Sequence, residues 1–266
     1  MLRHSRRLGS AAAAQTLEPF LVVFDKDGTL IDFHSMWGPF AEKQADLMIE
    51  RAMADRPVSS QDAFRSDYFS LMDYDQYTGK VGAKGYLACN TFDEISEATA
   101  DLLAKHADSS SGFKALTDSL IEELAPDGTE FEPRGDIKGL FEALIAMGGQ
   151  VAVCTTDDRA PTVASLSDMG LDDLVVACSC GDDGLPSKPN REQIEVLSAA
   201  AGGISPARSV MVGDTPKDMQ LGANAECSLK VGLTGGASTL EDLSEGADCL
   251  ITDLRKLPHL VRCALS

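Results

Sequence analysis

The chain lacks the long apolar runs and the surplus of basic residues that mark two large classes of protein. No run approaches the roughly 18 residues that a membrane-spanning helix needs, so we expect neither an integral membrane protein nor a membrane partner. The 23 Lys and Arg residues are outnumbered by 42 Asp and Glu, and the formal net charge is −19. A nucleic-acid partner is therefore not expected, and an anionic ligand must be held by local cations.

Paired cysteine spacings of the kind that bind zinc are also missing. The 7 cysteines are an odd number, and several of them lie in apolar stretches. Cys178 and Cys180 are close in sequence, but no second pair exists that would complete a metal site. We interpret the cysteines as reduced thiols, several of them buried, which favours an intracellular, reducing compartment.

Acidic residues are absent from residues 1–17, which carry Arg3, Arg6 and Arg7 among Ala and Ser. Such a composition is typical of mitochondrial and plastid transit peptides. A disordered tail of a cytoplasmic protein explains it as well. We therefore leave this segment out of the fold, and it stays open whether it is a cleaved targeting peptide.

The rest of the chain has the composition of a soluble globular protein, with 44% hydrophobic residues. Short apolar runs alternate with stretches of helical periodicity, which predicts an α/β fold with a doubly wound, Rossmann-like parallel sheet. The predicted strands are Phe20–Phe24, Val151–Cys154, Leu174–Cys178, Ser209–Val212, Ser228–Val231 and Cys249–Ile251. The helices predicted between them include Asp136–Met147, Arg191–Ala201 and Pro216–Ala223.

The gap between the first two predicted strands is roughly 120 residues, where a crossover needs only one helix. Four helices are predicted inside this gap, at residues 35–56, 61–74, 92–106 and 113–124. Thr91 and Glu94 form a capping box before the third, and Thr78–Gly85 is a glycine-rich loop. We predict a helical cap domain at residues 35–125, inserted into a core domain formed by residues 18–34 and 126–266.

Polar side chains follow four of the predicted strands, at the edge where the carboxyl ends of parallel strands meet. They are, in strand order, Asp25 and Asp27, Thr155, Lys188, and Asp214 with Asp218. Carboxylates from two strands can hold Mg²⁺, and a lysine and a hydroxyl can bind phosphoryl oxygens, so this set suits phosphoryl transfer. Taken singly, each residue is better explained as a turn, a helix cap or a surface side chain. Their joint placement argues for a site.

These motifs resemble those of the haloacid dehalogenase superfamily. The similar segments are DKDGT at 25–29, the hydroxyl of Thr155, the pair Lys188-Pro189 and GDTPKD at 213–218, and the resemblance spans nearly all of residues 20–252. It implies a fold like that of phosphoglycolate phosphatases, with a helical cap inserted directly after the first motif. It also implies a Mg²⁺-dependent phosphatase that acts on a small phosphorylated metabolite, either an organic acid or a sugar phosphate.

The resemblance implies a role for each matching residue. Asp25 would be the nucleophile that forms an aspartyl-phosphate. Asp27 would be the acid/base; dehalogenases carry Tyr there and phosphonatases Ala, so Asp27 favours phosphate esters. The metal ligands would be Asp25, Asp214 and the backbone carbonyl of Asp27. Thr155 and Lys188 would bind the phosphoryl group, with Gly28 and Thr156 as further phosphate-binding positions. Asp218 would order bound water or Lys188. Lys26 should project away from the phosphate.

Other candidates rest on position alone. Arg159 could bind a substrate carboxylate or a second phosphate, or form a salt bridge that flanks a helix. Lys80 and Lys84 of the glycine-rich loop could contact substrate or remain solvated. His34 and Trp37 could line the substrate entrance or pack at the hinge to the cap.

Two other functions stay open. A phosphosugar mutase of the β-phosphoglucomutase type would use the same aspartates, but the Thr78–Gly85 loop is a poor match to the basic cap loop of those enzymes. A non-catalytic binding protein on the same fold is disfavoured by the intact set of polar residues. The physiological substrate and the oligomeric state cannot be read from the sequence.

Overall fold

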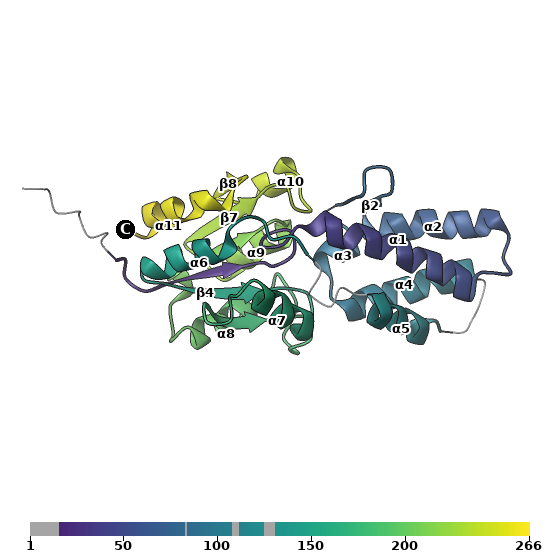
Figure 1. The fold of residues 1–266 in the computed structure, drawn as a ribbon, viewed down its shortest axis with the longest axis horizontal. Helices are drawn as coiled ribbons and strands as arrows, with labels where there is room; N and C mark the ends of the chain where they lie inside the picture. Colours follow the sequence, from purple (N-terminus) through teal and green to yellow (C-terminus); the bar gives the residue numbers. More distant parts are fainter. Residues whose placement is uncertain (1–15, 83, 108–111, 125–130) are drawn as a thin grey trace, which may run out of the picture.

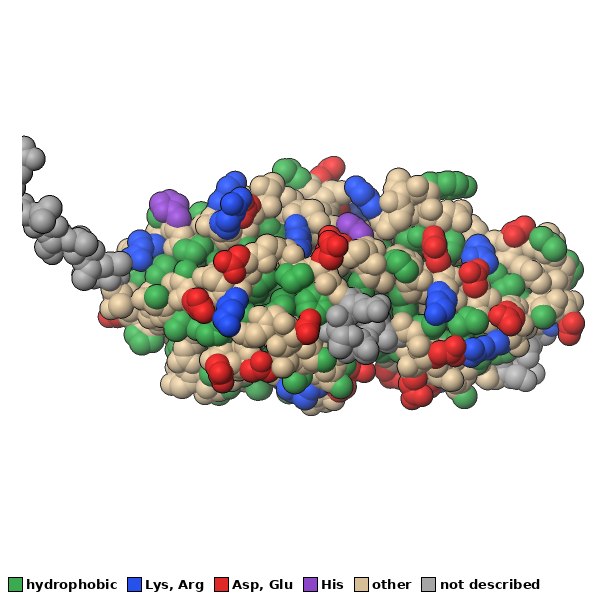
Figure 2. Space-filling view, viewed as in Figure 1, with side chains coloured by type: hydrophobic (Ala, Val, Ile, Leu, Met, Phe, Trp, Pro, Cys, Tyr) green, Lys and Arg blue, Asp and Glu red, His purple; other side chains and the backbone are tan. Residues whose placement is uncertain are grey.

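The structure is a computed structural model that describes residues 16–82, 84–107, 112–124 and 131–266 (Figure 1). Nearly all of the predicted N-terminal targeting or tail segment, residues 1–17, lies outside the described residues. Within the described ranges, no helix combines the length and the apolar character needed to cross a membrane. On the face shown in Figure 2, acidic and basic side chains are interspersed, and the described residues form no continuous basic area there.

A six-stranded parallel sheet confirms the predicted α/β fold. In spatial order its strands are β5 (Val175–Ser179), β4 (Gly149–Cys154), β1 (Phe20–Phe24), β6 (Ser209–Gly213), β7 (Leu229–Leu233) and β8 (Cys249–Ile251). All five residues of β1 are buried, as expected for the apolar segment FLVVF in the middle of a sheet covered on both faces. Because β1 is the third of the six strands, its carboxyl end lies near the middle of the sheet edge.

Helices cover both faces of this sheet. They are α6 (Ile137–Ala146), α7 (Arg159–Asp168), α8 (Glu192–Ala200), α9 (Pro216–Asn224), α10 (Leu240–Ser244) and α11 (Leu257–Leu265), with 3₁₀ turns η1 (Pro206–Arg208) and η2 (Leu254–Lys256). Successive side chains of β1 point to opposite faces. Phe20, Val22 and Phe24 pack in one apolar cluster with α6 and α11, while Leu21 and Val23 pack in another with α8 and α9.

A second body is built from the segment between β1 and α6. It comprises α1 (Phe33–Ala52), α2 (Val58–Met72), β2 (Tyr74–Asp75), β3 (Lys80–Val81), α3 (Tyr86–Cys89), α4 (Phe92–His106) and α5 (Lys114–Leu124). We call these residues, 33–124, the helical body. It has its own apolar cluster, which includes Met48, Phe64, Tyr68 and Leu103. Figure 1 shows it at one end of the sheet, where β1 leads into α1.

Several predicted boundaries are wrong by a few residues. Helix α1 begins at Phe33 instead of residue 35, because the Asp32 carboxylate caps it by accepting the N–H of Ser35 at 3.0 Å. It ends at Ala52 rather than residue 56, and α2 begins at Val58 rather than residue 61.

Other elements show where the sequence pattern works and where it fails. The capping box of Thr91 and Glu94 is confirmed. The predicted loop Thr78–Gly85 contains β3, which pairs with β2 in a short antiparallel hairpin. Helix α7 was not predicted, since few of its residues are apolar and Pro161 lies in its first turn.

The packing of β1 against α6 gives a first prediction. Phe141 is fully buried and its ring centroid lies 5.0 Å from that of Phe24. We expect Phe141→Ala to lower the free energy of unfolding by about 3–5 kcal/mol in urea titrations, since it leaves a cavity in the core. Val163→Ala, at a side chain that is 48% exposed, is the control and should change the value by less than about 0.5 kcal/mol.

Candidate active site

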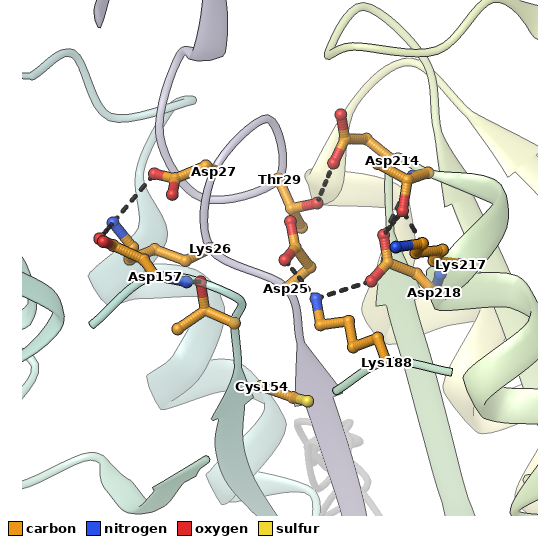
Figure 3. Close-up of polar contacts among 12 residues, drawn as sticks. Asp25, Lys26, Asp27, Thr29, Cys154, Asp157, Lys188, Asp214, Lys217 and Asp218 are labelled. Carbon is orange, nitrogen blue, oxygen red and sulfur yellow. Dashed lines mark hydrogen bonds and ion pairs between the residues drawn. The ribbon is translucent and has the colours of Figure 1, made fainter. Parts of the chain in front are cut away.

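The loop that leaves β1 carries residues Asp25 to Thr29 to the edge where β4 and β6 also end (Figure 3). The N–H of Asp25 donates to the carbonyl of Val212 at 2.9 Å, which ties the start of the loop to β6. The loop then turns back, because the N–H of Gly28 donates to the carbonyl of Ile31 at 2.8 Å. Gly28 has a φ of +84°, which glycine adopts without a steric penalty.

Lys188 connects two carboxylates at this edge. Its Nζ lies 2.6 Å from Oδ1 of Asp25 and 2.8 Å from Oδ1 of Asp218, and all three side chains are buried. Burial raises the pKa of Asp25 to about 7, an effect that the Lys188 cation opposes. Burial also opposes the charge of Lys188, but the carboxylates of Asp218 and Asp25 hold its pKa well above the usual value. The lysine therefore stays charged.

Asp214 is held by hydrogen bonds and by two glycines. Its Oδ1 accepts from the hydroxyl of Thr29 at 3.2 Å, and its Oδ2 accepts from the N–H of Ala237 at 2.6 Å. A Cβ added at Gly28 or at Gly236 would lie 2.2 Å from Oδ2 of Asp214, so only glycine permits this approach. Burial, with Asp25 and Asp218 nearby, raises the pKa of Asp214 well above its usual range.

The carboxylates of Asp25, Asp214 and Asp218 offer oxygen atoms that all lie within 4.8 Å of one another. Oδ2 of Asp25 is buried and has no hydrogen-bond partner among the described residues. A buried unpaired oxygen in a cluster with excess negative charge fits a divalent cation, and an all-oxygen ligand set fits Mg²⁺. Asp218 is the least available of the three. Its Oδ1 contacts Lys188, and its Oδ2 accepts from both the N–H and the hydroxyl of Thr215.

A second charged cluster lies on the other side of the loop (Figure 3). Lys26 is buried, and its Nζ lies 2.9 Å from Oδ1 of Asp27 and 2.6 Å from Oδ2 of Asp157. Burial raises the pKa of Asp157 to about 6, although Lys26 acts against this. Lys26 therefore projects to the other side of the loop from Asp25, in agreement with the prediction. Its ion pair with Asp27 was not predicted.

A cavity lies between the sheet edge and the helical body. Its empty volume is about 420 Å³, part of it open to solvent. The lining residues from the sheet edge are Asp25, Asp27, Thr155, Thr156, Asp157, Thr215 and Ala237. Those from the helical body are Phe33, Trp37, Leu87, Ala88, Asn90, Phe92 and Ile95. The Oγ1 of Thr155 accepts from the N–H of Asp157 at 3.1 Å, which leaves its own O–H free to donate.

Three predicted substrate-binding cations do not line this cavity. Arg159 pairs with Asp183, with Nε to Oδ1 at 2.8 Å, so the structure has the salt bridge that was its other interpretation. Lys84 is largely exposed and lies 3.1 Å from Asp242. Lys80 is exposed on β3. The structure therefore brings none of the three to Asp25.

His34 and Trp37 have different surroundings, although they were considered together. Trp37 lines the cavity. The Nδ1 of His34 instead accepts the N–H of Val81 at 3.3 Å, which links α1 to β3. Of the two interpretations offered by the sequence, Trp37 fits the cavity wall and His34 fits the packing role.

Sequence reasoning missed two residues that hold the site together through hydrogen bonds with backbone groups. Ala237 supplies a hydrogen bond to Asp214 from the loop that follows β7. Arg134 donates to the carbonyls of Gly28 and Thr234, which ties the loop after β1 to the end of β7. The segment DKD at 25–27 could have indicated the Lys26 cluster, since a lysine between two aspartates directly after a buried strand must find charged partners.

Comparison with known proteins identifies the family of this chain. A family model described as haloacid dehalogenase-like hydrolase matches residues 21–226. No curated protein matches the sequence. The similar solved structures described next are distant in sequence.

Three solved structures illustrate the similarity of fold. A predicted phosphoglycolate phosphatase from Haemophilus somnus 129pt has a TM-score of 0.64 and 20% identity, covering 90% of this chain and 96% of that one. A proposed haloacid dehalogenase-like hydrolase from Bacteroides fragilis has a TM-score of 0.63 and 17% identity, over 90% and 100%. A proposed β-phosphoglucomutase from Thermotoga maritima has a TM-score of 0.60 and 15% identity, over 92% and 100%. At these identities the similarity concerns the fold alone.

The Lys26 cluster gives a prediction for stability. Lys26→Met should lower the free energy of unfolding by about 3–5 kcal/mol near pH 7, because Asp27 and Asp157 lose their buried counter-charge. The deficit should be smaller at pH 5 than at pH 7.5, because Lys26 lowers the pKa of Asp157 and its removal lets the native carboxyl take up a proton already above about 6. Urea unfolding at pH 5 and pH 7.5 measures both effects. A deficit that is the same at both pH values, or below 1 kcal/mol, would contradict this account.

The acidic cluster gives a prediction for Mg²⁺. Added Mg²⁺ should raise the free energy of unfolding by about 2.7 kcal/mol at 100 times its dissociation constant. Gly236→Ala should weaken that response at least several-fold, because its Cβ displaces the carboxylate of Asp214. Gly112→Ala, where nothing lies within 4 Å of the added Cβ, is the matched control. Thermal unfolding with and without Mg²⁺ separates this effect from any loss of stability in the metal-free protein.

Proposed function

Because the chain belongs to the haloacid dehalogenase-like hydrolases, we propose that it is a Mg²⁺-dependent phosphatase acting on a small phosphorylated metabolite through an aspartyl-phosphate. The observation that carries this proposal is the environment of Asp25. One carboxylate oxygen of Asp25 is held by Lys188 at 2.6 Å. The other is buried and makes no hydrogen bond within the described part of the chain, and Asp25 lines the cavity. A carboxylate that is oriented through one oxygen and free at the other suits attack on phosphorus.

The proposed reaction has two steps. In the first, a carboxylate oxygen of Asp25 bonds to phosphorus, the bond to the leaving alcohol oxygen breaks, and Asp27 protonates that oxygen. In the second, a water molecule attacks the phosphorus, Asp27 accepts its proton, and inorganic phosphate leaves with the Asp25 carboxylate restored. Lys188 and the hydroxyl of Thr155 bind the phosphoryl oxygens, with backbone groups of Gly28 and Thr156 nearby.

Asp25 and Asp214 are the side chains best suited to hold Mg²⁺, together with the backbone carbonyl of Asp27. A bound Mg²⁺ supplies positive charge against the combined charges of the phosphoryl group and the carboxylates. Asp218 contributes indirectly, because it holds Lys188 against Asp25.

Lys26 and Asp157 act as positioning residues in this proposal. The Nζ of Lys26 holds the carboxylate of Asp27 at 2.9 Å and is itself held by Asp157 at 2.6 Å. Since Asp27 lines the cavity, this pair limits the directions in which it can deliver its proton. An acid/base must lie within hydrogen-bond reach of the atom it serves.

The helical body serves as the cap. Its apolar residues close the cavity over Asp25 and exclude water during transfer, which also favours small substrates over proteins. We propose a catalytic core of residues 18–34 and 126–266 with a cap at 35–125. The helix cap at Asp32 indicates that the junction lies about two residues earlier than this sequence-based boundary.

A phosphosugar mutase remains the second candidate because a proposed β-phosphoglucomutase shares the fold. The cavity favours the phosphatase, since neither Lys80 nor Lys84 lines it. Release of inorganic phosphate from glucose 1-phosphate, as opposed to its conversion to glucose 6-phosphate, distinguishes the two.

The proposal predicts hydrolysis of p-nitrophenyl phosphate that requires Mg²⁺ and Asp25. Asp25→Asn should lower kcat by at least about 1,000-fold, because the amide cannot act as the nucleophile. Asp253→Asn, at a surface ion pair with Arg255, is the control and should retain full activity. Absence of turnover, or turnover that survives Asp25→Asn or EDTA, would falsify the proposed mechanism.

A further inference from the structure

The wall of the cavity formed by the helical body is apolar and largely aromatic. Phe33 and Trp37 of α1, Leu87 of α3, and Phe92 and Ile95 of α4 contribute to it. The ring of Trp37 lies 6.3 Å from that of Phe33 and 5.8 Å from that of Phe92, centroid to centroid, so the three rings form a continuous surface. If the phosphoryl group binds at Asp25, the remainder of the substrate must contact this wall.

No lysine or arginine is found among the described residues that line the cavity. The charged groups that do line it are carboxylates, Asp25, Asp27 and Asp157. Of the nearby ammonium groups, those of Lys188 and Lys26 each already contact two carboxylates, and that of Lys217 donates to the carbonyl of Cys89 at 2.6 Å. A carboxylate or second phosphate on the substrate would lose its hydration here without meeting a cation among the described residues that line the cavity, which is unfavourable.

The aromatic wall contains one buried donor that lacks an acceptor. Trp37 is 4% exposed, and its Nε1 makes no hydrogen bond with any described residue. A buried N–H without a partner is unfavourable, and this cost is recovered when an oxygen of a ligand accepts from it. Asn90, whose side-chain amide donates to Glu94 at 3.2 Å, is a further uncharged polar residue that lines the cavity.

We propose that the substrates are phosphate esters of small, uncharged alcohols that carry a further oxygen able to accept from Trp37 Nε1. This inference rests on the proposed phosphatase function. Of the two substrate classes that the sequence left open, it selects neutral, sugar-like alcohols over phosphorylated organic acids. The carbon skeleton packs against the aromatic rings, and a hydroxyl oxygen meets the indole N–H.

Two matched pairs of substrates test this selection. 2-Hydroxyethyl phosphate and phosphoglycolate differ only in a CH₂OH group against a carboxylate, and so do glycerol 3-phosphate and 3-phosphoglycerate. In each pair we expect kcat/KM with Mg²⁺ to be at least about 10-fold higher for the neutral member, from the cost of burying an unpaired carboxylate. p-Nitrophenyl phosphate and Asp25→Asn serve as the positive and negative controls.

The outcomes separate this inference from the function on which it rests. Equal rates within a pair, preference for the acid, or hydrolysis of the aryl phosphate without hydrolysis of any of the four, overturn the inference and leave the phosphatase function standing. Absence of turnover on all five compounds overturns the phosphatase function, and the inference falls with it.

Two substitutions test the residues involved. Trp37→Phe keeps an aromatic ring but removes the donor, so kcat/KM for 2-hydroxyethyl phosphate should fall by about 5–100-fold. The loss on ethyl phosphate, which lacks the hydroxyl, should be several-fold smaller. Equal losses on the two substrates would show that Trp37 acts through packing alone.

Asn90→Lys introduces a cation at the wall and should raise kcat/KM for phosphoglycolate relative to 2-hydroxyethyl phosphate by at least about 10-fold. Asn224→Lys, which adds the same charge on an exposed part of α9, is the matched control and should leave the ratio unchanged. If Asn90→Lys leaves the ratio unchanged, the absence of a cation from the cavity lining is not what excludes acids. Circular dichroism verifies that each variant is folded.

Discussion

Burying four carboxylates at one edge of a sheet is unfavourable, and the arrangement of the site depends on how that charge is balanced. The carboxylates are those of Asp25, Asp157, Asp214 and Asp218, and the buried lysines are Lys26 and Lys188. Removing a charge from water costs several kcal/mol even after the protein relaxes. Asp25, Asp214 and Asp218 offer oxygens within 4.8 Å of one another and Lys188 contacts two of the three, so this part of the site has excess negative charge that a cation would balance. The rigid, fully buried β1 holds the groups together against their repulsion.

The residues that sequence reasoning found are those that directly follow apolar strands. Asp25, Thr155 and Asp214 could be predicted to lie together because parallel strands end at one edge, and the structure brings them there. The contribution of Ala237 could not be predicted, because it depends on a backbone N–H and on how the loop after β7 folds. The placement of Arg159 was likewise undetermined. Its partner, Asp183, is 24 residues away, and no local pattern pairs them.

Helix α1 joins the two halves of the cavity. It begins at Phe33, only eight residues after Asp25, and it presents Phe33 and Trp37 to the same cavity that Asp25 lines. The carboxylate edge and the aromatic wall are therefore connected through a short, tightly turned loop.

The close approach of Gly28 and Gly236 to Asp214 affects the size of cation that this carboxylate could accept. Ca²⁺ takes oxygen ligands at about 2.3–2.6 Å, whereas Mg²⁺ requires about 2.0–2.1 Å. To admit the larger ion, carboxylates must move apart. Asp214 has little room to withdraw, because the peptide backbone of two loops lies directly against its Oδ2. We therefore expect a small cation at this carboxylate, because the two glycines limit how far Asp214 can move.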